Sequence, residues 1–151
     1  MNEFIVIIPS RLSSTRLKEK ALLDLNGKSL IERVYLRAIQ SNASKVFIAT
    51  DSKKIEDHVK NFTSNVILTS IEHVSGTDRV HECASKLDIN DDMVIVNVQG
   101  DEPFINPETI NRTADIILKN KNASVGSACT PFNDNDFEDP NNVKVSLSDS
   151  Y

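Results

Sequence analysis

Short apolar runs alternate with amphipathic stretches along most of this 151-residue chain, and this alternation limits the possible folds more than any other feature. The apolar runs are rich in β-branched residues and predict strands over residues 4–8, 45–50, 65–69, 92–98, 123–130 and 143–147. Between most of them, apolar residues recur three or four positions apart, which predicts helices over 30–42, 55–62, 76–86 and 106–118. Strands that alternate with helices indicate an α/β fold with a largely parallel sheet.

Net charge, cysteine content and the length of the apolar runs limit which partners the protein can bind and in which compartment we expect it. The net charge of −5 argues against a general nucleic-acid or membrane-surface binder, because both functions favour a basic face. Cys83 and Cys129 lie far apart, which favours reduced thiols over a disulfide framework or a zinc site. No apolar run approaches the length of a membrane span. We therefore expect a cytoplasmic protein without a nucleic-acid or membrane partner.

A cluster of cations and hydroxyls directly follows the first predicted strand. In residues 9–20, Arg11 and Arg16 offer planar forks for phosphate oxygens, and Lys20 offers a movable point charge. A strand that leads into such a loop often forms an anion site in an open α/β sheet. A solvated basic loop is the alternative, and two later clusters make it the weaker interpretation.

The second cluster lies between a predicted strand and the helix predicted from residue 76. Ser75, Gly76 and Thr77 would place two hydroxyls and a flexible backbone at the N-terminus of that helix. Free N–H groups and the helix dipole favour negative or polar ligands there. An ordinary helix cap with an acidic first turn explains the same residues, and it is the better explanation if this cluster is considered alone.

The third cluster follows the strand predicted over 92–98. Gly100 would let the backbone approach a ligand closely, and Asp101 offers a hard oxygen ligand suited to Mg²⁺ together with phosphates. The alternative is a turn whose acidic residues face water. In an open α/β sheet the carboxyl ends of the strands face the ligand crevice, which favours a binding role.

Taken together, these motifs resemble the sugar-activating cytidylyltransferases. The pattern Pro9-x-Arg11-x-x-Ser14-x-Arg16-Leu17-x-x-Lys20 is similar to the signature of that superfamily. The stretches 73–79, 94–103 and 140–145 resemble the branch that activates 3-deoxy-manno-octulosonate (KDO). The resemblance runs from residue 4 to about 147. It implies a Rossmann-like nucleotidyltransferase fold with a mostly parallel, mixed sheet flanked by helices, with residues 1–151 as the nucleotide-binding part of one domain.

The resemblance also implies an activity and a set of site residues. The reaction would transfer CMP from CTP to KDO, giving CMP-KDO and pyrophosphate with Mg²⁺, for lipopolysaccharide biosynthesis. The residues implied as catalytic are Arg16, Lys20 and Asp101, with Asp101 also the metal ligand. The residues implied as nucleotide-binding are Arg11, Ser14, Ser75, Gly76, Thr77, Arg79 and Gln99.

Two positions depart from the family pattern, and the chain is short for the family. Lys18 replaces the usual Pro of the basic loop, which frees its backbone, and Val74 stands where the family often has Gln. Ser148 to Tyr151 resembles a turn between strands, so we expect an N-terminal portion of a longer protein that forms a homodimer. Alternatives are a cytidylyltransferase for a related acidic sugar, such as an acylneuraminate or amino-KDO, and a CTP-binding fragment without turnover.

Overall fold

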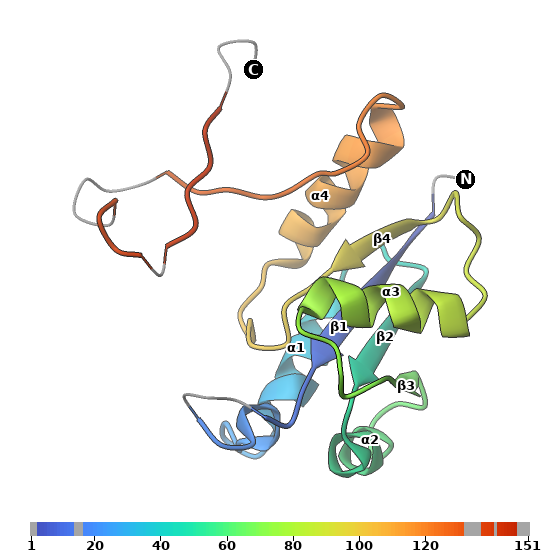
Figure 1. Ribbon diagram of the computed structural model, residues 1–151, viewed down its shortest axis with the longest axis vertical. Coiled ribbons are helices and arrows are strands. Elements are labelled where there is room, and N and C mark those ends of the chain that lie inside the picture. Colours follow the sequence, from blue (N-terminus) through green and yellow to red (C-terminus); the bar gives the residue numbers. More distant parts are fainter. Residues whose placement is uncertain (1–2, 14–16, 132–136, 141, 148–151) are drawn as a thin grey trace.

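The structure, a computed structural model, describes residues 3–13, 17–131, 137–140 and 142–147. This part of the chain contains a sheet of four parallel strands in the order β3-β2-β1-β4 (Figure 1). The strands are β1 (Phe4–Ser10), β2 (Lys45–Thr50), β3 (Val66–Leu68) and β4 (Val94–Asn97). β1 pairs with a neighbour on each side, and all seven of its residues are buried. The most apolar run of the chain therefore forms the centre of the sheet.

The helices begin at residues whose side chains cap them. The α-helices of the described chain are α1 (Leu30–Ala38), α2 (Lys53–Val59), α3 (Gly76–Lys86) and α4 (Pro107–Lys119), and a short 3₁₀ helix, η1, spans Lys20–Leu22. The caps are Ser29, Ser52, Ser75 and Asn106, each of which accepts a hydrogen bond from a backbone N–H in the first turn. These bonds satisfy donors that have no partner within the helix, and so they fix where each helix starts.

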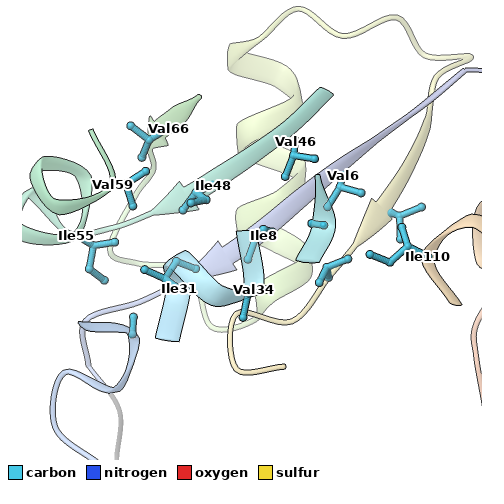
Figure 2. Close-up of a cluster of buried hydrophobic side chains, with 14 of the residues drawn as sticks. Val6, Ile8, Ile31, Val34, Val46, Ile48, Ile55, Val59, Val66 and Ile110 are labelled. Carbon is cyan, nitrogen blue, oxygen red and sulfur yellow. The ribbon is translucent and has the colours of Figure 1, made fainter. Parts of the chain in front are cut away.

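Side chains of β1 alternate between two apolar cores, one on each face of the sheet. Val6 and Ile8 pack in the larger core with residues of α1, α2 and α4 (Figure 2). Ile5 and Ile7 pack on the opposite face against Val80 and Cys83 of α3. Because successive side chains of a strand point to opposite faces, an uninterrupted apolar run is suited to a sheet covered on both sides.

The predicted α/β fold with its parallel sheet is confirmed. The predicted helix 76–86 matches α3, whereas α1 ends at Ala38, short of the predicted residue 42. Pro107 occupies the first position of α4, as its fixed backbone angle favours. All four strands that the structure describes are parallel, so the antiparallel component of a mixed sheet is not found among them.

The strands predicted over 123–130 and 143–147 are wrong for the described residues. No strand is assigned there, and Val125, Val143 and Leu147 are largely exposed. A strand needs a neighbour to bond its backbone groups, and in the described chain β4 pairs with β1 alone. After α4 the chain instead leaves the body of the sheet (Figure 1). Within the described residues, no helix has the length and hydrophobicity needed to cross a membrane.

Candidate functional site

The three polar clusters meet at the carboxyl ends of the strands. All four described strands run parallel, so these ends lie at one edge of the sheet. A cavity of about 250 Å³ opens there. Its walls come from the loop after β1, the segment before α3 and the loop after β4. The lining residues are Pro9, Ser10, Arg11, Lys20, Ala21, Leu30, His73, Val74, Ser75, Gly76, Arg79, Gln99, Gly100 and Asp101.

Two glycines let the three walls approach one another around Pro9. A Cβ atom at Gly100 would lie 2.6 Å from the backbone oxygen of Pro9, closer than such atoms can approach. A Cβ at Gly76 would lie 3.3 Å from the Cγ of Pro9, a tight contact with a side chain. The absence of a side chain at both positions therefore brings the loops after β1 and β4 and the start of α3 into contact.

Ser75 both caps α3 and lines the cavity. Its hydroxyl oxygen accepts a hydrogen bond from the backbone N–H of Asp78 at 3.1 Å, and its O–H donates to Asp78 Oδ2 at 2.7 Å. The ordinary capping role that the sequence offered as an alternative is thus present. It is compatible with binding, because the cap places the N-terminus of α3 at the cavity wall.

Arg79 is held in a buried ion pair. Its Nη2 donates to Oδ2 of Asp51 at 2.9 Å, and the two side chains are only 3% and 5% exposed. Its Nη1 donates to the Thr69 hydroxyl at 2.6 Å and to the Ser70 carbonyl at 3.1 Å. A guanidinium with these three contacts holds the strand ends together, and it also lines the cavity.

Glu82 of α3 secures the segment that carries His73. Its carboxylate accepts hydrogen bonds from Lys86 Nζ and the backbone N–H of Ser70, and it also contacts His73 Nε2. Lys86, Ser70 and then His73 stabilise the ionised form and lower the pKa of Glu82 to about 2, although partial burial acts in the opposite direction. The carboxylate therefore stays charged over the whole physiological range.

Asp101 lies at the edge of the cavity beside Lys20. Lys20 Nζ and Asp101 Oδ2 are 2.7 Å apart, and the two side chains are roughly half exposed. Burial, followed by the charge of Asp101, raises the pKa of the neighbouring Glu102. No group of three or more metal-ligating side chains occurs in the described residues. A single carboxylate fits Mg²⁺ when substrate phosphates supply further oxygens, which is how Mg²⁺ is usually bound.

Most of the sequence-predicted site residues that the structure describes are brought together. Those that line the cavity are Arg11, Lys20, Ser75, Gly76, Arg79, Gln99 and Asp101. Thr77 lies instead beside a second cavity along β4, because one further step around α3 turns its side chain away. Ser14 and Arg16 lie outside the described residues. Their functional roles, like those of the lining residues, stay predictions.

Sequence reasoning missed Asp51 and Glu82. Asp51 stands next to Ser52, a residue type common at helix caps, and in the structure the side chain of Ser52 caps α2. The position of Asp51, directly after a strand, is the signal that could have identified it, because Asp101 was found at such a strand end. Glu82 lies in the middle of a helix and carries no comparable signal.

The family model for cytidylyltransferases matches residues 5–151. The chain belongs to the cytidylyltransferase family. Curated relatives named 3-deoxy-manno-octulosonate cytidylyltransferase include those of Francisella tularensis subsp. tularensis (strain SCHU S4), 45% identical over 141 residues, and Saccharophagus degradans, 48% identical over 143 residues. The alignments cover 93% and 94% of the chain and 56% of each relative. The chain thus spans little more than half the length of these cytidylyltransferases.

Two solved structures resemble the chain in fold. CMP:2-keto-3-deoxy-manno-octonic acid synthetase complexed with CTP matches with a TM-score of 0.73 and 36% identity, covering 79% of this chain and 48% of that one. A cytidylyltransferase from Leptospira borgpetersenii serovar Hardjo-bovis matches with a TM-score of 0.62 and 23% identity, covering 80% of this chain and 50% of that one. The second likeness supports the nucleotidyltransferase fold alone.

Proposed function

We propose that this chain is the CTP-binding portion of a cytidylyltransferase that transfers CMP from CTP to KDO, with release of pyrophosphate. The observation that carries the proposal is the cavity in which all three motif clusters meet. The relatives named for this reaction and the matching synthetase complexed with CTP support it. The resemblance to the family further implies that the product would supply lipopolysaccharide biosynthesis and that a longer protein would be a homodimer, and the composition favours the cytoplasm.

Charge explains how the cavity would hold a triphosphate. The chain carries a net charge of −5, yet Arg11 and Lys20 both line the cavity. They would hold the phosphates together with the predicted Ser14 and Arg16, since fixed cations stabilise the charge that develops on phosphoryl oxygens. Ser75, Gly76 and Gln99 would lie around the cytidine. Arg79 would contact the nucleotide while it stays paired with Asp51.

Mg²⁺ would be held by Asp101 and the phosphates. When bound, the metal would stabilise phosphoryl charge and favour the alkoxide form of the attacking KDO hydroxyl. Lys20 Nζ lies 2.7 Å from Oδ2 of Asp101 at the edge of the cavity. Lys20 would thereby hold the carboxylate near the site in which it acts, and would itself reach the α-phosphate.

Calorimetry of the 151-residue chain with CTP, followed by pyrophosphate release with CTP, KDO and Mg²⁺, tests the proposal. We expect binding of CTP in preference to ATP, GTP and UTP. Absence of CTP binding by a folded chain would refute it. Turnover would show that these residues suffice for catalysis, whereas binding without turnover would favour a portion that needs the rest of a longer protein. Turnover with neuraminic acid instead of KDO would assign the related acidic sugar.

Asp101→Asn tests the metal ligand in the same assay. The Lys20–Asp101 pair is about half exposed, so its loss should change the stability by no more than about 1 kcal/mol. We expect the variant to retain metal-free CTP binding and to lose the additional affinity that Mg²⁺ confers. Lys119→Ala, which removes an exposed ion pair on α4, is the matched control. An unchanged response to Mg²⁺ would show that Asp101 is not a ligand.

A further inference from the structure

The buried carboxylate of Asp51 pairs with Arg79, which lines the cavity, but Asp51 itself does not line it. Asp51 follows the last residue of β2, and its side chain is only 5% exposed. Its partner, Arg79, is 3% exposed. Burial of two charges costs a large desolvation penalty, so such a pair is weak evidence for stability alone. The contacts of Asp51 indicate another role.

The two oxygens of Asp51 contact two different walls of the cavity. Oδ1 accepts a hydrogen bond from the backbone N–H of Leu12 at 3.2 Å. Oδ2 accepts one from Nη2 of Arg79 at 2.9 Å. Leu12 directly follows Arg11 in the loop after β1, and Arg79 belongs to the first turn of α3. One carboxylate therefore joins the basic loop to the helix whose N-terminus lines the cavity.

Arg79 extends this connection to the end of β3. Its Nη1 contacts the Thr69 hydroxyl at 2.6 Å and the Ser70 carbonyl at 3.1 Å. Thr69 in turn donates its backbone N–H to the carbonyl of Thr50, the residue before Asp51, at 2.7 Å. The segments that follow β1, β2 and β3 are thus fixed to one another around a single ion pair.

We infer that Asp51 is a positioning residue for the phosphate-binding loop. By accepting from the Leu12 N–H while paired with Arg79, it fixes where Arg11 stands relative to the start of α3. The inference rests on the proposed function, because it takes Arg11 to bind the phosphates of CTP. It assigns Asp51 no contact with substrate.

Comparing CTP with CMP separates positioning from general destabilisation. CMP lacks the two outer phosphates, so only CTP should depend strongly on the position of the loop. We expect Asp51→Ala to lower the ratio of the CMP to the CTP dissociation constant by about tenfold, as is common when an orienting group is removed. Asp51→Asn should lower the ratio less than Asp51→Ala does, because its amide oxygen can still accept from Leu12, although its NH2 group would face the buried Arg79 guanidinium and that pairing would be lost. Ile110→Ala, in the core beneath α4, should lower the melting temperature and leave the ratio unchanged.

Hydrogen exchange of the Leu12 amide tests the anchor without any ligand. Asp51→Ala should accelerate its exchange, and Asp51→Asn and Ile110→Ala should do so much less, at a temperature where all variants are folded. Unchanged exchange in Asp51→Ala, or an unchanged ratio of dissociation constants, would overturn the inference. If the unsubstituted chain binds no CTP, the proposed function fails, while the exchange result still decides whether Asp51 holds the loop.

Discussion

Gly100 is the residue that most tightly limits how the cavity is built. Its Cα faces the backbone oxygen of Pro9, and an added Cβ would lie 2.6 Å from that oxygen. Backbone atoms of β1 and the loop after β4 cannot separate without disturbing the pairing of β1 with β4. At Gly76 the corresponding neighbour is the ring of Pro9, at 3.3 Å, which can shift slightly.

We therefore expect Gly100→Ala to be more damaging than Gly76→Ala. The clash in Gly100→Ala should cost about 1–3 kcal/mol of the free energy of unfolding, as overpacking usually does, and should weaken CTP binding. Urea denaturation and calorimetry of both variants measure the two effects. Equal losses of stability in the two variants would mean that the close approach to the Pro9 oxygen is relieved by a backbone shift.

Glu82 should make the stability of the chain sensitive to acid. Its folded-state pKa is lowered to about 2 from its ordinary value of 4.5, so its stabilising contribution is present above pH 4.5 and is lost as the pH falls from 4.5 to 2. Glu82→Gln should therefore lower the melting temperature at pH 7, and the difference from the unsubstituted chain should shrink towards pH 2. Glu108→Gln, at an exposed pair on α4, is the control. A difference that stays constant with pH would contradict this account.

Residues of the cavity could be predicted from the sequence where they follow the end of a predicted strand. Arg11, Lys20 and Asp101 come soon after apolar runs, and the carboxyl ends of parallel strands meet at one edge. Asp51 carries the same signal, although Ser52 beside it is typical of a helix cap and caps α2 in the structure. The role of Glu82 could not be predicted. Its partners Ser70 and His73 lie in the loop before α3, and the sequence does not specify the course of that loop.

At the scale of elements, α3 concentrates the contacts that organise the site. Ser75 caps it, Arg79 in its first turn pairs with Asp51, and Glu82 one turn later holds Ser70 and His73. These positions are three or four residues apart, so they share one face of the helix. A displacement of α3 would therefore disturb several walls of the cavity at once.

Removing the cap of α3 should affect both stability and binding. Ser75→Ala should cost about 1 kcal/mol, as the loss of an N-cap side chain typically does, and should lower CTP affinity because the first turn frays. Asn106→Ala removes the cap of α4, which does not line the cavity, and should lower stability alone. Thermal unfolding and calorimetry of both variants test this. Equal losses of CTP affinity in the two variants would show that the start of α3 contributes no more to CTP binding than the start of α4.

Helices were predicted better than strands because a helix depends on nearby residues, whereas a strand depends on distant ones. A helix satisfies most backbone groups within itself, so spacing and caps such as Asn106-Pro107 locate it from nearby residues. A strand depends on a distant partner. The apolar runs at 4–8, 45–50, 65–69 and 92–98 find neighbours in the described chain, whereas those at 123–130 and 143–147 do not. Apolar alternation alone does not reveal whether such a neighbour exists.

At the scale of the whole molecule, the protection of the backbone should fall steadily away from β1. This strand is paired on both edges and is covered on both faces by the two apolar cores. β3 and β4 are the outer strands of the described sheet, and α3 and the cavity loops depend on the contacts around Asp51. The residues of the site are thus connected to β1, the strand expected to be most stable, through the less stable outer strands of the sheet.

Hydrogen exchange across the full chain tests this order. Amides of Val6, Ile7 and Ile8 should exchange only through global unfolding, since β1 opens only when the sheet does. Amides of residues 125–131 and 143–147 should exchange at nearly unprotected rates, because no strand is assigned there. Strong protection in either segment would mean that it pairs with a neighbouring strand in solution. The apolar runs would then have correctly predicted strands that the described arrangement lacks. The free edge of β4 would be the expected pairing partner for such a strand, because in the described chain β4 is bonded only to β1.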